Sequence, residues 1–102
     1  MVKITLVCSA GMSTSMLMEK MKEAAKSEGI EVQIQALSEC EIKNNIEDTD
    51  ILLLGPQVRY MVSNMRAAYG NKISVIEVIN MSDYGLMNGQ KVLNDALTLY
   101  NK

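Results

Sequence analysis

The sequence predicts a single α/β domain over residues 1–102, a three-layer, doubly wound fold with a four-stranded parallel sheet and helices on both faces. Short apolar runs of strand length alternate along the whole chain with longer stretches of helical periodicity. Right-handed crossovers between parallel strands then favour the strand order 2-1-3-4. A chain of 102 residues is the size of one domain and can bury a core without a disulfide or metal.

The first third of the chain predicts two strands separated by a helix. A β-branched run over residues 2–7 ends at Cys8, and a cleanly alternating run over residues 31–37 suits a strand near the sheet edge. A helix is expected from about residue 13 to residue 28, with Gly29 as its C-cap. Its apolar face recurs at helical spacing: Leu17, Met21, Ala24 and Ala25.

The next segment predicts a short helix, a buried strand and a second long helix. Ser38 and Glu41 form a capping box for a helix through residue 46. The continuous apolar run over residues 50–54 is typical of a strand buried on both faces. Pro56 then opens a helix that ends at Gly70. The buried stripe expected for that helix comprises Val58, Met61, Val62, Met65 and Ala68.

The remaining residues complete the alternation. Residues 73–79 are predicted as the fourth strand, and residues 88–100 as the last helix. The inward face of that helix comprises Val92, Leu93, Ala96 and Leu97. In the order 2-1-3-4 the chain changes direction between the first and third strands, where ligands of open α/β sheets bind. The loop from Cys8 to Ser15 and the turn at residues 55–57 meet there.

Composition excludes several classes of function. A net charge of −2, with only two arginines, argues against nucleic-acid binding. No apolar run reaches the roughly 20 residues of a membrane span, and the N-terminus lacks a signal-peptide cleavage site. We therefore expect a cytoplasmic protein, in which Cys8 and Cys40 are reduced thiols. Histidine is absent, which removes the commonest general base and zinc ligand. We expect no metal and no cofactor.

The loop after the first strand carries the candidate chemistry. It reads Cys8, Ser9, Ala10, Gly11, Met12, Ser13, Thr14, Ser15. Small residues running into a helix N-terminus allow backbone N–H groups to converge on an anion. The same positive end of the helix dipole is expected to lower the pKa of the Cys8 thiol and to make it a nucleophile. The loop therefore predicts a phosphate cradle with a nucleophilic cysteine at its mouth.

This loop resembles that of low-molecular-weight tyrosine phosphatases, in which a cysteine is followed by five residues, an arginine and then Ser or Thr. Here Thr14 occupies the arginine position. Arginine clamps a phosphoryl group through two hydrogen bonds and stabilises charge in the transition state. Its absence favours a phosphocysteine that persists long enough to be passed on. A Cys-loop phosphatase or an arsenate-reductase-like enzyme stays the alternative.

The whole chain is similar to a more specific family, the enzyme IIB components of the bacterial sugar phosphotransferase system, lactose/cellobiose (chitobiose) type. The resemblance rests on the Cys8–Ser15 loop, on residues 53–61, and on residues 76–79 followed by Asp83-Tyr84-Gly85 and Asn88-Gly89. Asn80 departs from the acidic residue that the family pattern leads us to expect after residue 79.

The resemblance implies a phosphoryl relay. A IIA partner carrying phosphohistidine would donate to Cys8, and Cys8 would pass the group to a sugar held by a membrane-embedded IIC partner. The resemblance points to a β-linked disaccharide such as cellobiose or chitobiose. Because the protein docks two partners in turn, without inserting into the membrane, we expect a monomer.

Other residues have weaker assignments. Gln57 and Tyr84 follow the third and fourth strands and are predicted at the pocket rim. Met12 could project outward to touch a partner, and Arg59 could reach the phosphate, although a solvent-exposed arginine is the default. Carboxylates beside Cys40 oppose thiolate formation, so this second cysteine is interpreted as structural.

Overall fold

A computed structural model describes residues 1–8 and 12–102, and in this part of the chain four parallel strands form one sheet. The strands are β1 (Val2–Cys8), β2 (Val32–Ser38), β3 (Ile51–Leu54) and β4 (Val75–Val78). Their order, β2-β1-β3-β4, confirms the predicted one. Residues 2–8 of β1 pair in register with 32–38 of β2, and residues 4–7 pair with 51–54 of β3.

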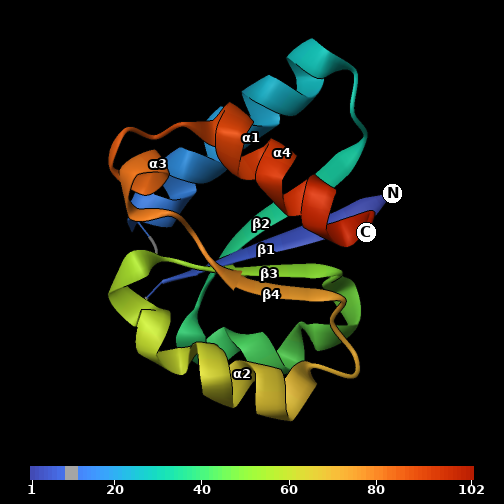
Figure 1. The fold of residues 1–102 in the computed structure, drawn as a ribbon, viewed down its shortest axis with the longest axis vertical. Coiled ribbons are helices and arrows are strands. Elements are labelled where there is room, and N and C mark those ends of the chain that lie inside the picture. Colours follow the sequence, from blue (N-terminus) through green and yellow to red (C-terminus); the bar gives the residue numbers. More distant parts are fainter. Residues whose placement is uncertain (9–11) are drawn as a thin grey trace.

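Helices cover both faces of the sheet and give the predicted three layers (Figure 1). On one face lie α1 (Met12–Glu28), α3 (Met81–Gly85) and α4 (Gly89–Tyr100). On the other lie α2 (Val62–Tyr69) and three 3₁₀ helices, η1 (Glu39–Asn44), η2 (Ile46–Asp48) and η3 (Pro56–Met61). Gly29 ends α1 with a φ of 69°, as its predicted C-cap role requires.

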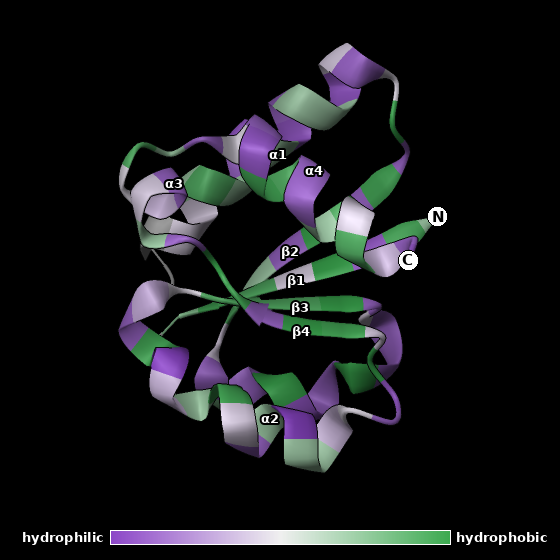
Figure 2. Ribbon diagram, in the orientation of Figure 1, coloured by the Kyte–Doolittle hydropathy of each residue, from purple (hydrophilic) through white to green (hydrophobic). Residues whose placement is uncertain are grey.

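The alternation of side chains along β1 divides the core into two layers. Ile4 and Leu6 face α1 and α4, whereas Val7 faces η1, η3 and α2. Every residue of β3 is buried, in agreement with its continuous apolar run. Figure 2 shows this as hydrophobic strands in the middle of the molecule and hydrophilic colour on the outer helix faces. The sheet is therefore packed between two apolar layers.

The helix expected over residues 38–46 is wrong in type. The segment forms η1 and η2 instead, and within η1 Ile42 is the single buried residue, too little to anchor a full α-helix. The predicted capping pair is present: the Glu41 carboxylate accepts hydrogen bonds from the Ser38 hydroxyl at 2.8 Å and the Ser38 N–H at 3.1 Å. These bonds hold the pKa of the Glu41 carboxyl below its usual value.

The helix expected from Pro56 to Gly70 is split into η3 and α2. Val58 has non-helical backbone angles, φ −115° and ψ 22°, because its side chain turns into the core while the chain changes pitch. This shift moves the buried stripe, so that Ala68 is exposed and Tyr69 packs against the core in its place. The predicted positions Met61, Val62 and Met65 are partly buried, as expected.

The fourth strand is shorter than the predicted 73–79, although Ile73 and Ile79 at its flanks are buried. Arg66 of α2 contacts β4. Its Nε and Nη2 donate to the Ile76 carbonyl at 3.0 and 2.9 Å, and Nη2 lies 3.0 Å from a carboxylate oxygen of Glu77. Helix α3 was not predicted from the sequence, since five residues are too few to show a helical period.

Candidate active site at the carboxyl end of the sheet

The carboxyl ends of three neighbouring strands meet around Cys8. Cys8 ends β1 and is the register partner of Ser38 at the end of β2. Gly55 follows β3, and its N–H donates to the carbonyl of Val7 at 2.8 Å. The chain changes direction between β1 and β3, so Cys8 occupies the crevice that α/β folds use for ligands.

Cys8 contacts the first turn of α1 through Thr14. The sulfur of Cys8 lies 3.3 Å from Oγ1 of Thr14, within hydrogen-bonding distance. Cys8 is 4% exposed and Thr14 is fully buried, so this contact is shielded from bulk water. A hydroxyl at this distance can donate to a thiolate, and donation to the charged form favours that form.

The start of α1 is the part of the predicted anion cradle that the structure describes. The helix runs for 17 residues and has no acidic residue in its first turn, so none of that turn's own side chains offsets the positive end of the helix. Thr14 and Ser15 belong to this turn, Thr14 buried and Ser15 exposed. The predictions for Ser9, Ala10 and Gly11 lie outside the described residues, as do those for the side chains of Met12 and Ser13.

Gln57 lies beside Cys8 because Gly55 has no side chain. A Cβ placed on Gly55 would lie 2.9 Å from Oε1 of Gln57 and 3.4 Å from Cβ of Cys8. The amide of Gln57 and the cysteine thus flank the same glycine. The glutamine itself is exposed, and its place at the rim of a pocket stays a prediction.

Tyr84 lies on α3, beyond the carboxyl end of β4, and is 7% exposed. Its ring belongs to the core layer shared with Leu17 of α1. Its hydroxyl is buried and has no hydrogen-bond partner among residues 1–8 and 12–102. A buried hydroxyl without a partner is costly, so the Tyr84 hydroxyl is a donor available to an acceptor.

The remaining sequence candidates make contacts of other kinds or are exposed. Arg59 is exposed on η3, as an arginine is by default, and Cys40 is exposed on η1. Because the Ser38 hydroxyl donates to Glu41, the 3.2 Å contact between Ser38 and Cys40 is a thiol donating to the serine oxygen. Asn80 has a structural role, because its Oδ1 accepts the Asp83 N–H at 3.1 Å and caps α3.

Large apolar side chains are exposed on the elements that follow β1, β3 and β4. They are Met16 of α1, Tyr60 of η3, and Met81 and Leu86 beside the two ends of α3. The sequence alone did not single them out, because exposure at one end of a sheet is a property of the fold. Exposed apolar groups around a functional site are typical of surfaces that receive a partner.

Within residues 1–8 and 12–102, no group of three or more His, Cys, Asp or Glu side chains is arranged to hold a metal ion. No helix in this part of the chain combines the length and apolar character needed to cross a membrane.

The family model of the lactose/cellobiose-specific IIB subunit of the sugar phosphotransferase system matches residues 3–95. The chain belongs to this family. It is 40% identical over 99 residues to the oligo-β-mannoside-specific EIIB component of Bacillus subtilis, covering 97% of this chain and 96% of that protein. It is 43% identical over 103 residues to the cellobiose-specific EIIB component of Lactococcus lactis subsp. lactis, covering 96% and 95%.

Solved structures of IIB components share the fold. The solution structure of a cellobiose-specific IIB component from Borrelia burgdorferi matches with a TM-score of 0.80 and 42% identity, covering 98% of this chain and 92% of that one. A lactose-specific IIB domain from Streptococcus pneumoniae matches with a TM-score of 0.87 at 19% identity, covering 97% of each chain.

A more distant solved structure also shares the fold. A mutant of YwlE from Bacillus subtilis matches with a TM-score of 0.55 at 13% identity, covering 98% of this chain and 94% of that one. At this identity the likeness shows a shared fold alone. The family match instead identifies a IIB component, which accepts a phosphoryl group and transfers it to a sugar, working with a IIA donor and a membrane IIC partner.

Proposed function

We propose that Cys8 is the residue of this IIB component that carries the phosphoryl group. The Cys8 sulfur would attack phosphorus of a phosphohistidine on IIA, forming an S–P bond while the N–P bond breaks. In the second step a sugar hydroxyl bound by IIC attacks phosphorus. An O–P bond forms, the S–P bond breaks with its electron pair left on the Cys8 sulfur as a thiolate, and the hydroxyl proton passes to water. The single observation that carries this assignment is the buried 3.3 Å contact between Cys8 and Thr14 at the start of α1.

The cradle for the phosphoryl oxygens is assigned to residues 9–15. The proposal is that backbone N–H groups of Ser9, Ala10, Gly11 and Met12 converge on the oxygens, with those of Ser13, Thr14 and Ser15. Support comes from the positive end of α1, whose first turn has no acidic residue and which favours a group carrying close to two negative charges. The loop has no arginine, so stabilisation rests on backbone dipoles and hydroxyl donors.

Gln57 and Tyr84 are proposed as rim residues that complete the site. The Gln57 amide oxygen and Cβ of Cys8 both lie next to Gly55, and this shared neighbour supports a contact between the amide and a group bound on the Cys8 sulfur. The Tyr84 hydroxyl is a buried donor that finds no partner in the described part of the chain, and a phosphoryl oxygen is an acceptor that would satisfy it. In this arrangement neither residue takes part in bond making, and both orient the bound group.

The exposed apolar side chains of Met16, Tyr60, Met81 and Leu86 support docking of both partners on this face in turn. We propose that the protein is a cytoplasmic monomer. A thiol that must stay reduced to accept phosphate supports the location, and a docking face used by two successive partners supports the monomer.

The sugar is proposed to be a β-linked disaccharide such as cellobiose or chitobiose. This rests on the relatives named as cellobiose-specific and oligo-β-mannoside-specific components. A galactose-specific component of Lactococcus lactis subsp. cremoris is also 43% identical. We therefore assign the choice of sugar to IIC.

The test is Cys8→Ser, compared with Cys40→Ser as the matched control. Incubation with phosphorylated IIA should label the parent and Cys40→Ser on Cys8 and leave Cys8→Ser unlabelled, since serine lacks the thiol's low pKa. Mass spectrometry of intact protein and peptides locates the phosphate, and circular dichroism verifies the fold. Phosphate on any other side chain would overturn the assignment.

A further inference from the structure

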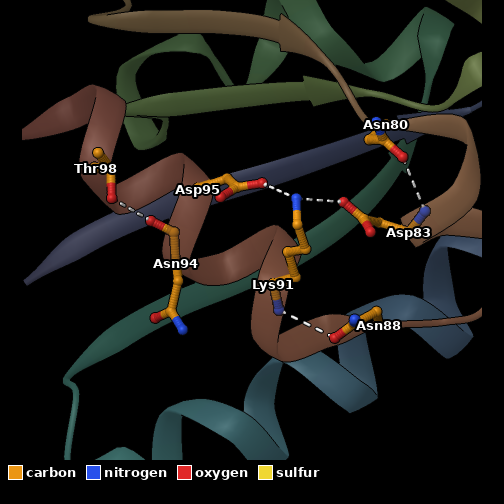
Figure 3. Close-up of polar contacts among 7 residues, drawn as sticks. All are labelled: Asn80, Asp83, Asn88, Lys91, Asn94, Asp95 and Thr98. Carbon is orange, nitrogen blue, oxygen red and sulfur yellow. Dashed lines mark hydrogen bonds and ion pairs between the residues drawn. The ribbon is translucent and has the colours of Figure 1, made fainter.

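Asp83 precedes Tyr84 and carries a nearly buried carboxylate whose cationic partner is Lys91. Its side chain is 10% exposed, and Nζ of Lys91 lies 3.1 Å from its Oδ2. The same ammonium lies 2.8 Å from Oδ2 of Asp95, whose side chain is 60% exposed (Figure 3). A carboxylate taken out of water is costly without a cation, so Asp83 depends on Lys91 more than the solvated Asp95 does.

The helix that carries Tyr84 is too short to hold its own position. Five residues make little more than one turn, which is unstable without outside contacts. Asn80 caps its start, and the Asn88 N–H donates to the Asp83 carbonyl at 2.8 Å. In addition to these contacts, Lys91 reaches from α4 to the Asp83 side chain on α3 (Figure 3).

Helix α4, which carries Lys91, packs against α1, the helix that begins at the predicted cradle. A Cβ on Gly89, at the start of α4, would collide with the carbonyl carbon of Lys20 and lie 2.5 Å from the N atom of Met21. The backbones of α4 and α1 are therefore in direct contact. The backbone of the first turn of α4, which carries Lys91, is thus held against α1.

We propose that Lys91 is a positioning residue for the phosphoryl relay: its ion pair with Asp83 holds the neighbouring Tyr84 hydroxyl where it donates to the phosphoryl group on Cys8. This rests on the proposed function. The ion pair ties α3 to the α1–α4 pair, one residue away from the buried hydroxyl that lacks a partner among the described residues. Hydrogen bonds to Asp95 and Asp83 raise the pKa of Lys91, so the cation is present at neutral pH.

The experiment compares Lys91→Met with Lys91→Arg and Asp95→Asn, each in the parent and in a Tyr84→Phe background. The readouts are the rate of phosphoryl transfer from phosphorylated IIA to Cys8 and the ³¹P chemical shift of the phosphocysteine. Lys91→Met should slow transfer at least fivefold and move the ³¹P resonance, whereas Lys91→Arg and Asp95→Asn should stay within twofold of the parent. In the Tyr84→Phe background, Lys91→Met should cause no further slowing.

Two results would overturn the proposal: a folded Lys91→Met that transfers at the parental rate, or equal slowing in both backgrounds, which marks a purely structural role. If Lys91→Met does not fold, Asp83→Asn removes the same ion pair with a side chain of equal size and is subject to the same two criteria. A parent protein that takes phosphate at a residue other than Cys8 would overturn the proposed function itself. This outcome is distinct from a failure of the Lys91 proposal, in which Cys8 is still phosphorylated.

Discussion

The hydroxyl of Thr14 lies 3.3 Å from the sulfur of Cys8, with both side chains buried. Thr14 occupies the position at which the phosphatase loop carries its arginine. This chain therefore has a neutral hydroxyl donor where the phosphatases have a charged guanidinium that binds two phosphoryl oxygens. A neutral hydroxyl can stabilise a thiolate or a sulfur-bound phosphoryl group without neutralising the charge that builds up when water attacks. The chemistry expected of this pair is acceptance and transfer, with slow hydrolysis.

Thr14→Val tests the hydroxyl while keeping the buried volume. A hydrogen bond to a charged group contributes about 1.5 kcal/mol, so its loss should slow phosphoryl acceptance by roughly tenfold. It should also raise the pKa of the Cys8 thiol, because the thiolate loses a donor. Thiolate absorbance against pH in the unphosphorylated protein measures this shift. Thr14→Ser keeps the hydroxyl and should behave like the parent, and an unchanged titration in Thr14→Val would contradict the role.

Gly55→Ala tests the space that lets Gln57 approach Cys8. The new Cβ would meet Oε1 of Gln57 at 2.9 Å, and the end of that flexible side chain can move aside. The backbone of Gly55, at φ −61° and ψ 152°, is open to alanine, so the free energy of unfolding should change by no more than about 1 kcal/mol. Transfer should nevertheless slow as much as in Gln57→Ala, and the double variant should be no slower than either. Additive slowing would show that Gly55 acts independently of Gln57.

Gly89→Ala tests the contact between α4 and α1, with Gly85→Ala as its control. A Cβ on Gly89 would lie 2.5 Å from the N atom of Met21 and 2.7 Å from Cβ of Lys20, so the helices must separate. Overpacking of this kind costs about 1–3 kcal/mol in the free energy of unfolding, measured by urea denaturation. A Cβ on Gly85, in α3, would meet no described atom within 4 Å, so alanine there should be neutral or stabilise by up to about 1 kcal/mol. Equal effects of the two changes would contradict the close helix contact.

Much of the fold follows from local pattern. The apolar runs over residues 2–7 and 50–54 specify buried strands, and the handedness of crossovers specifies the sheet order. The prediction of secondary structure fails in short segments, where few residues carry a pattern. Residues 38–46 bury too little to choose an α-helix over a 3₁₀ helix, and α3 is too short to show a period, although Asn80 as a cap three residues before Asp83 is a usable signal.

The site could be predicted only in part, for a physical reason. Cys8 and the small residues after it are contiguous, so their chemistry is visible in the sequence. The register of Ser38 with Cys8, the approach of Gln57 across Gly55, and the ion pair between Asp83 and Lys91 join residues from different elements. Such contacts depend on how the strands and helices pack, which a single sequence does not encode in any local pattern.

Thr14→Arg tests whether the missing arginine protects the phosphocysteine. A guanidinium at this position could bridge two phosphoryl oxygens and stabilise the charge that develops when water attacks. The variant should therefore lose its phosphoryl group to water faster than the parent. The effect should be modest, because an acid for the leaving group and a positioned water are still lacking.

Thr14→Lys is the matched control, since it adds a positive charge without the planar guanidinium that binds two oxygens at once. The measurement is the phosphocysteine half-life by ³¹P NMR, on protein whose fold is verified by circular dichroism because Thr14 is fully buried. A well-folded Thr14→Arg that accepts phosphate and holds it as long as the parent would mean that the lifetime is set by exclusion of water from the cradle.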